Sequence, residues 1–203
     1  MDAYEAIVSR VSVRRFKPDP IPDEVIKKIL EAGIRAPSAG NGQQWYFIIV
    51  KDNEEMKAKL HELILKAHIK YAEEVAHEDT MPEEVKRRWL EALRKGEMYK
   101  APLYVAAYLD LRKSQYKKEY EELERVWAIQ SLSAAIENMI LAAWAEGIGS
   151  VWLGDPLLMP EEFNALLKPP EGCELQAIIA FGYPVRTPKP RPRKPLEEVS
   201  KWL

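Results

Sequence analysis

Residues 131–147 read SLSAAIENMILAAWAEG, a stretch with the composition of a helix at the centre of a domain. It is apolar almost all round and rich in Ala and Ser, which predicts an α-helix buried on most of its sides. Small side chains also let neighbouring elements approach closely. The helical pattern begins near Tyr120, and Gly147 is a natural residue to end it because glycine readily adopts a positive φ.

Four segments rich in β-branched and aromatic residues predict strands around this helix. They read WYFIIV at 45–50, LYVAAYL at 103–109, SVWLG at 150–154 and LQAIIAFGYP at 175–184. Because WYFIIV does not alternate between polar and apolar residues, we expect this strand to be buried on both faces.

Further helices are predicted at 2–10, 23–36, 53–76, 82–99 and 160–167. The resulting order, ααβααβαβαβ, predicts a small sheet covered by helices, as in α+β or α/β sandwiches. With 203 residues, no repeat and no shift in composition, the chain 1–203 is expected to form one domain. The segment from about 184 to 203 is too rich in proline to enter a sheet, which predicts an extended C-terminal arm.

Charge and composition argue against several classes of partner. The formal net charge is −2, which does not favour nucleic acid, and we see no apolar run of the ~20 residues that span a bilayer. The N-terminus has no signal-like layout, and Cys173 is the only cysteine, so no internal disulfide forms. We therefore expect a cytoplasmic protein without a membrane or nucleic-acid partner.

Metal binding and side-chain nucleophiles find little support in the sequence. His61, His68 and His77 lie in one charged helical region and are expected at the surface, with the first two too far apart to share an ion. Cys173 has no evident base beside it. The sequence contains no phosphate-binding P-loop, dinucleotide fingerprint or nucleophile elbow, so we expect no metal site and no catalytic triad.

Two basic motifs lie at opposite ends of the chain. In SRVSVRRF, residues 9–16, the guanidinium and hydroxyl donors that bind phosphate are offered by Arg10, Ser12, Arg14 and Arg15, although a solvated basic loop is the alternative. In PKPRPRKP, residues 188–195, Arg191 and Arg193 point the same way if the backbone is extended. A disordered basic tail, a polyproline ligand or a nucleic-acid arm are the alternatives there.

A third motif, APSAGNGQQWYFIIV at 36–50, places Ser38, Asn41, Gln43 and Gln44 just before a strand. Side-chain amides can read the edge of a planar heterocycle, and the two glycines let a ligand come close to the backbone. The alternative is a turn whose amides cap their own backbone.

Taken together, SRVSVRRF, RAPSAGNGQQWYFIIV, SAAIENMILAAWAEGIGSVWLGD, AFGYP and PRPRKPLEE resemble, in order and spacing, the nitroreductase family of FMN enzymes. The likeness covers nearly the whole chain. It implies an α+β fold, a three-layer α-β-α sandwich whose small, mostly antiparallel sheet is covered by helices. It also implies an intertwined homodimer that binds two FMN molecules at the subunit interface. The chain departs from the family pattern at Val11, where a second arginine is usual, and at Gln44, where proline is common.

The resemblance also implies where FMN binds. The residues expected to hold the phosphate and ribityl chain are Arg10, the backbone of Val11, Ser12, Arg14, Arg191 and Arg193. The residues expected to line the flavin ring through backbone groups are Trp152, Leu153 and Gly154. The residues expected to reach the flavin from the partner chain are Arg35, Pro37, Ser38, Ala39 and Asn41.

The activity implied is that of an FMN-dependent NAD(P)H oxidoreductase with a ping-pong mechanism. NADH or NADPH would supply a hydride, and a nitroaromatic, quinone or similar small conjugated compound would accept it in turn. Since the flavin carries the chemistry, no catalytic side chain is expected. The substrate-covering segment is expected within residues 66–115. Alternatives are reductive dehalogenation or flavin breakdown on the same scaffold, a non-catalytic flavin-binding protein, or a nucleic-acid binder that uses the C-terminal arm.

Overall fold

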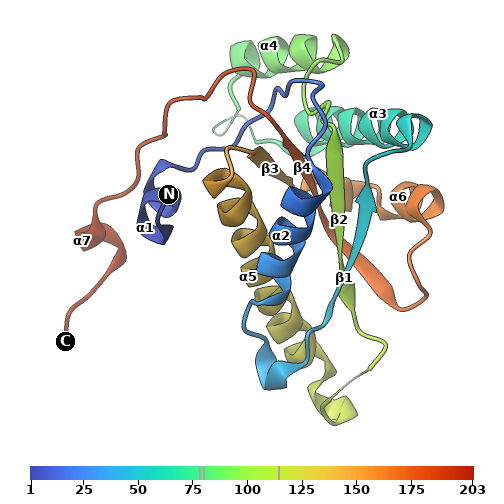
Figure 1. Cartoon of the computed structure of the whole chain (residues 1–203), viewed down its shortest axis with the longest axis vertical. Helices are drawn as coiled ribbons and strands as arrows, with labels where there is room; N and C mark the ends of the chain where they lie inside the picture. Colours follow the sequence, from blue (N-terminus) through green and yellow to red (C-terminus); the bar gives the residue numbers. More distant parts are fainter. Residues whose placement is uncertain (78, 80, 114) are drawn as a thin grey trace.

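The helix predicted from residues 131–147 packs against the sheet in one of the two apolar cores. In the computed structural model, which describes residues 1–77, 79, 81–113 and 115–203, helix α5 extends over Glu121–Ala145. Gly147 follows its end with a φ of 76°, as the sequence predicted. Figure 1 shows α5 running the length of the sheet with α2 (Asp23–Ile34) beside it.

Four strands form one sheet in the order β1-β2-β4-β3, and every pairing is antiparallel. The strands are β1 (Trp45–Val50), β2 (Leu103–Asp110), β3 (Gly149–Leu153) and β4 (Cys173–Gly182). The central strand β2 is buried on both faces because helices cover each side of the sheet. The predicted α+β class and mostly antiparallel sheet are therefore confirmed.

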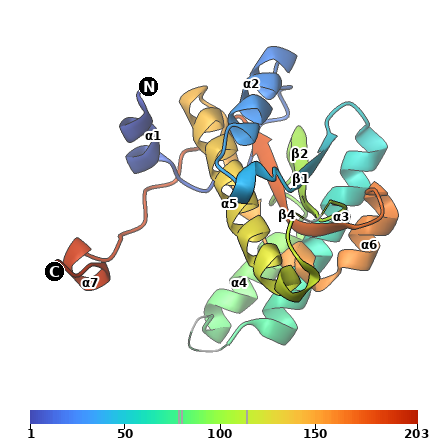
Figure 2. The same ribbon diagram turned by 90° about the horizontal axis from the view of Figure 1, so that it is seen from below.

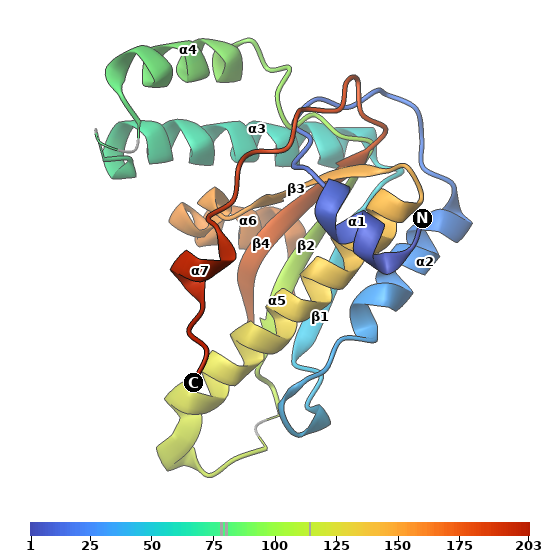
Figure 3. The same cartoon turned by 90° about the vertical axis from the view of Figure 1, so that its left-hand side faces the viewer.

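Two apolar cores lie on opposite faces of the sheet, and the residues of β2 alternate between them. Leu103 and Val105 belong to the core shared with α2 and α5, whereas Tyr104 and Ala106 belong to the other. The second core is closed by α3 (Glu54–Lys70), α4 (Glu83–Arg94) and α6 (Pro160–Leu167), which Figure 3 shows on the far side of the sheet from α5. These are the three layers of an α-β-α sandwich.

Helix α5, extended back to Lys118, is long and apolar enough to cross a bilayer by length and composition alone, which the sequence analysis did not anticipate. Its inner side chains Leu132, Ile136 and Met139 are buried in the core shared with α2 and the sheet. This packing explains the apolar composition of α5 as that of a core helix.

The two ends of the chain lie together. Helix α1 (Ala3–Ser9) and the C-terminal arm occupy the same side of the molecule, away from the sheet (Figure 2). Residues 187–195 form no helix or strand, and a short helix α7 (Leu196–Val199) follows.

The predicted double-sided burial of β1 is wrong for the single chain. Tyr46 and Ile49 are 37% and 39% exposed, because β1 is an edge strand that pairs only with β2. An apolar run without alternation shows that a strand meets apolar surroundings, but it does not show which elements supply them.

Two helix ends also differ from prediction. Helix α4 ends at Arg94 rather than near Tyr99, because Gly96 and Tyr99 both have positive φ, which an α-helix cannot accommodate. Helix α3 ends at Lys70, and the expected continuation toward residue 76 is a single turn of π-helix, Tyr71–Val75.

The expectation of surface histidines is wrong for His68, which is only 3% exposed and lies in the interior beneath α4. His61 is half-buried and donates from Nε2 to the Met98 carbonyl oxygen at 2.8 Å, whereas His77 is exposed. The charged residues on the outer face of α3 concealed the inward direction of His68.

His61 generates a test of stability against pH. Burial lowers its pKa; the hydrogen bond to the Met98 carbonyl opposes this shift and nearby Lys100 adds to it. An unfolded histidine takes up a proton near pH ~6.5, whereas folded His61 does so only at lower pH, so acid favours unfolding. We expect His61→Gln to reduce the loss of unfolding free energy between pH 7 and pH 5.5, measured by urea denaturation. Equal slopes for wild type and His61→Gln would contradict the assignment.

Candidate functional site

The segment that follows α1 covers the open edge of β3. Ser12 forms a parallel bridge with Ser150, and the Val13 amide donates to the Ser150 carbonyl oxygen at 2.9 Å. Further along, Phe16 pairs with Pro184 beyond the end of β4. The N-terminal segment is therefore held between the edge of the sheet and the start of the C-terminal arm.

Close packing at Gly149 sets the position of this segment. A Cβ atom at residue 149 would lie 2.7 Å from Cγ2 of Val13, which is buried against β3. With Val11 and Val13 turned inward, the alternation of an extended chain leaves Ser12 partly exposed and Arg14 exposed.

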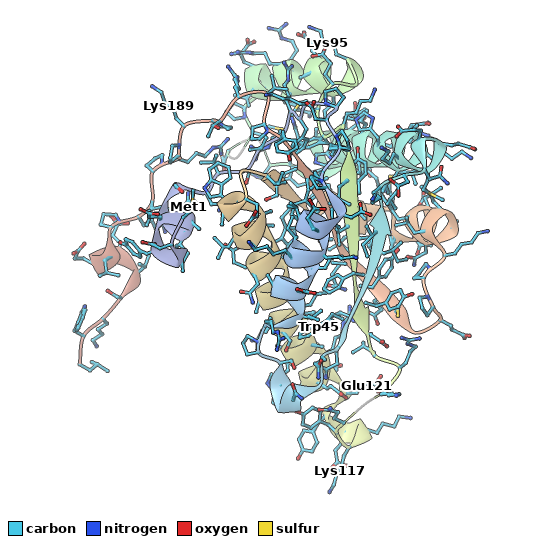
Figure 4. The ribbon with its side chains drawn as sticks, viewed as in Figure 1. Met1, Trp45, Lys95, Lys117, Glu121 and Lys189 are labelled. Atoms are coloured by element: carbon cyan, nitrogen blue, oxygen red, sulfur yellow. The ribbon has the colours of Figure 1, made fainter. Side chains whose placement is uncertain are left out.

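Side chains from both ends of the chain enclose a cavity of about 580 Å³. We call it the arginine cavity; its lining residues are Ile7, Val8, Arg10, Val11, Ser12, Arg14, Pro188, Lys189, Pro190, Arg191 and Arg193. Five of these carry a positive charge, and none of the described lining residues is acidic. Figure 4 shows Met1 and Lys189 on the same side of the molecule.

Two contacts with α5 hold the N-terminal wall of the cavity in place. Nε of Arg10 lies 3.8 Å from a carboxylate oxygen of Glu137, and the Arg10 side chain is mostly buried. The indole nitrogen of Trp144 donates to the Ser9 hydroxyl at 2.9 Å, which ties the end of α1 to the same helix. Arg14 is bound more loosely, with a 3.4 Å hydrogen bond from Nη1 to the Ser12 carbonyl oxygen. Its guanidinium group remains exposed.

The end of β3 exposes a large aromatic side chain next to this wall. Trp152 is 39% exposed, although Val151 and Leu153 on either side of it are buried. Gly154 follows with its backbone exposed, and the short 3-10 helix Asp155–Leu158 begins directly after it. The strand thus ends in an open apolar surface bordered by accessible backbone groups.

Residues 35–44, which we call the amide loop, are held partly by a hydrogen bond within the loop. The backbone amide of Gln43 donates to the Ser38 hydroxyl at 3.0 Å, and the backbone amide of Ala39 donates to the Ser131 hydroxyl of α5 at 3.3 Å. Asn41 and Gln43 both have positive φ, near 55° and 49°, a conformation that non-glycine residues rarely adopt. The self-capping alternative therefore describes part of this loop.

Within one chain, the loop does not meet the arginine cavity. Arg35, Pro37 and Asn41 are exposed and Ser38 and Ala39 half-buried, and none of them lines that cavity. The loop lies below α2, and Figure 4 marks its end at Trp45, whereas α1 and the arm lie higher on the opposite side. The predicted site residues thus fall into two separate groups.

Sequence reasoning missed three residues that border these groups. Lys189 lines the arginine cavity, and its spacing of two from Arg191 was the signal available. Asp155 and His68 face one another behind the end of β3, with Oδ2 and Nε2 3.4 Å apart. Burial raises the pKa of Asp155 and lowers that of His68.

The molecule is an α+β sandwich whose two chain ends line one cavity with five cationic side chains. The model of the nitroreductase family matches residues 7–183, and the chain belongs to that family. The expected family and its three-layer fold are therefore confirmed, and the chain is a nitroreductase-family oxidoreductase.

Two curated relatives cover almost the entire chain. An NADH dehydrogenase of Thermus thermophilus is 29% identical over 208 residues, covering 100% of this chain and 96% of that protein. An iodotyrosine deiodinase of Thermotoga neapolitana is 31% identical over 202 residues, covering 97% of this chain and 94% of that protein. Because the relatives carry different activities, the family defines the class of chemistry rather than the acceptor.

Two solved structures match at a similar level. A BluB-like flavoprotein from Clostridium difficile has 28% identity and a TM-score of 0.79, covering 100% of this chain and 99% of that one. A nitroreductase from Desulfovibrio desulfuricans, solved in complex with FMN, has 27% identity and a TM-score of 0.68, covering 98% and 95%. Flavoproteins are therefore among the structural relatives of this chain.

Gly149 generates a test of how the cavity wall is positioned. We expect Gly149→Ala to lower the free energy of unfolding by about 1–3 kcal/mol, because the new methyl group overlaps Val13. Adding Val13→Ala removes the nearest overlapping group, Cγ2 of Val13, although Cβ of residue 13 remains 2.9 Å away, so the double variant should lose less than the sum of the two single losses. Urea denaturation of the four proteins measures this coupling. Strictly additive losses would show that the close approach of Gly149 and Val13 does not constrain the segment.

Proposed function

We propose that this protein is an FMN-dependent NAD(P)H oxidoreductase that reduces nitroaromatic, quinone or similar conjugated acceptors by a ping-pong mechanism. The observation that carries this proposal is the arginine cavity, in which five cations from both ends of the chain converge. The phosphate of FMN carries nearly two negative charges, and burying such a group requires several cationic hydrogen-bond donors. The residues present fit that requirement.

The proposed binding mode assigns a part to each residue around the cavity. Arg10, Arg14, Arg191 and Arg193 donate to the phosphate, and Ser12 together with the Val11 backbone meets the ribityl chain. Lys189 adds a fifth cation. When FMN is bound, its ring supplies the redox chemistry, and the protein orients the ring and leaves one face open to substrate. The proposed contacts for the ring are the backbone groups of Trp152, Leu153 and Gly154.

The second group of residues is proposed to act across a homodimer interface. Arg35, Pro37, Ser38, Ala39 and Asn41 would then contact the flavin bound by the partner subunit. Exposed apolar side chains on α5 support this arrangement. Leu123, Val126 and Ile129 are spaced three apart on one helix face, where a second copy of the chain would cover them.

The proposed electron donor is NADH or NADPH, and the proposed location is the cytoplasm. The deiodinase relative supports reductive dehalogenation as a second candidate, in which the same reduced site would act on an aryl halide. Flavin breakdown and a non-catalytic flavin carrier are the remaining alternatives. They differ from the leading proposal in the acceptor, or in whether turnover occurs at all.

The direct test is the absorption spectrum of the purified protein. We expect a flavin spectrum, or its appearance after FMN is added, and bleaching by NADH or NADPH without oxygen. Adding a quinone or a nitroaromatic compound should then restore the colour. A colourless protein that does not take up FMN would contradict the proposal, and bound flavin without bleaching would favour a carrier. A panel of aryl halides would test the second candidate.

The arginine assignment predicts weaker cofactor binding on mutation. Arg14→Ala combined with Arg193→Ala removes two charge-assisted contacts worth ~1.5–3 kcal/mol each, so FMN affinity should fall at least roughly 100-fold. Equilibrium dialysis measures the affinity, and urea denaturation checks that the fold is intact. Arg15→Ala is the matched control, because Arg15 neighbours Arg14 but lies outside the cavity and pairs with Glu97. Unchanged affinity in the double variant would show that the phosphate binds elsewhere.

Subunit mixing tests whether the amide loop acts on the partner's site. One chain carries the two arginine substitutions, and the other carries Asn41→Asp, which keeps a residue tolerant of positive φ but removes the amide donor. Neither homodimer should retain FMN well. The mixed dimer should contain one fully wild-type site and bind about half the normal FMN. If the loop acted within its own subunit, every site in the mixed dimer would be defective and FMN would not be retained.

A further inference from the structure

A buried histidine and a partly buried carboxyl group meet directly behind the proposed ring site. His68 lies on α3, and Asp155 is the residue after Gly154. The His68 side chain is 4% exposed and that of Asp155 is 23% exposed, with Nε2 and Oδ2 3.4 Å apart. Asp155 is thus the end of the pair that solvent or a ligand can reach. Neither residue was among the site residues expected from the sequence.

The contacts of the His68 ring bear on the protonation of this pair. Nδ1 of His68 lies 2.8 Å from the Ile64 carbonyl oxygen, and because a carbonyl only accepts, Nδ1 carries a hydrogen. Nε2 then faces the Asp155 carboxyl oxygen. With no proton between them, a lone pair would face a carboxylate at 3.4 Å in a buried setting. A proton between the two groups, either on Nε2 beside a carboxylate or on Oδ2 beside a neutral ring, removes this repulsion.

The surroundings of His68 keep the pair in place and away from water. Its ring packs against Tyr99 with centroids 4.2 Å apart and meets Trp89 edge-on at 5.9 Å. The charged and titratable groups that face this region, among the described residues, are Arg14 from the N-terminal segment, Tyr99 from the loop before β2, and Lys70 from α3. Lys70 donates to the Leu158 carbonyl oxygen at 3.3 Å, in the 3-10 helix that Asp155 begins.

Arg14 connects this pair to the arginine cavity. It lines that cavity, and its charge also acts on His68 and on the Tyr99 hydroxyl. Asp155 is bonded to the last of the three residues proposed to contact the ring. A cofactor extending from the arginine cavity toward the end of β3 would therefore place its ring beside the accessible carboxyl group.

Stability alone gives little reason for such a pair. Replacing a buried ion pair with apolar residues of similar volume is often neutral or stabilising, so a buried pair is weak evidence of a structural role. Titratable groups held in such surroundings cluster at functional sites. Burial shifts the pKa of His68 downward and that of Asp155 upward, which brings the two groups closer in proton affinity.

We propose that His68 and Asp155 form the proton-donating pair of the active site, with Asp155 as the donor and His68 as the residue that positions and recharges it. This inference rests on the proposed oxidoreductase function. Reduction of a quinone adds one hydride, which carries two electrons from NAD(P)H, and one proton, giving the hydroquinone and NAD(P)⁺. The proton passes from the carboxyl group of Asp155 to the quinone oxygen: the carboxyl O–H bond breaks as the O–H bond of the hydroquinone forms, which leaves Asp155 as a carboxylate. Solvent then returns a proton to the pair through the exposed edge of Asp155.

The first experiment examines the pair without cofactor. The chain has three histidines, so the NMR titration of each imidazole can be followed in the FMN-free protein. In Asp155→Asn, the midpoint of His68 should fall, because the neighbouring carboxylate that favours its charged form is lost. His61, which lies outside the pair, should titrate as in the wild type. An unchanged midpoint for His68 would overturn the proposal.

The second experiment compares acceptors that do and do not need a proton. Quinone reduction by the NADH-reduced protein should slow about 100-fold in Asp155→Asn, as expected for loss of a general acid. Ferricyanide accepts only electrons, so its reduction should stay within twofold of the wild-type rate. Imidazolium buffer should partly rescue quinone reduction in the variant. Asp110→Asn is the matched control, because its side chain is also 23% exposed and ion-paired but lies at the end of β2.

The outcomes separate this inference from the proposed function. Equal slowing with both acceptors, or no rescue by imidazolium, would assign the pair a structural role only and overturn the proposal. Normal quinone reduction in Asp155→Asn would do the same, while leaving the oxidoreductase proposal intact. A wild-type protein that takes up no FMN would overturn both.

Discussion

Repulsion among like charges is the constraint around which this molecule is organised. Five cationic side chains line one cavity, and none of the described lining residues is acidic. Glu137, from outside the cavity, partly offsets the charge of Arg10. The arrangement is held by contacts that do not involve those charges, namely the Val13–Ser150 backbone hydrogen bond, the close approach at Gly149 and the inward packing of Val13. An anion bound in the cavity would therefore reduce the repulsion among the cationic side chains, which the backbone and apolar contacts otherwise counteract.

The residues that build the apolar cores differ from the residues that line the arginine cavity. The apolar cores on the two faces of the sheet use residues from α2 through β4, whereas the cavity uses residues before and after that region. The two parts are joined by the contacts of Arg10 and Ser9 with α5 and of Val13 with β3. A further link runs from Arg14, which lines the cavity, to His68, which packs against residues of the interior. A change in the cavity can thus reach the interior through several side-chain contacts.

The sequence predicted the elements of this fold well because their signals are local. The apolar helix ending at Gly147, the buried strand β2 and the helix α6 all carry their own pattern. Burial of β1 and His68 was predicted wrongly, because it depends on neighbours far along the chain. The same limit applies to the site. The arginine motifs could be recognised separately, but the contact between His68 and Asp155 joins residues 87 positions apart, and no local pattern marks it.

The position of the C-terminal arm has a consequence for biosynthesis. The sheet and the helices that cover it are complete once residue 182 has left the ribosome. The cavity lacks its C-terminal wall until residue 193 has also left it. The globular body can therefore form on the nascent chain before the arginine cavity exists. Proteolytic cleavage just after β4 would produce the same state from the finished protein, a folded body that lacks the C-terminal wall of the arginine cavity.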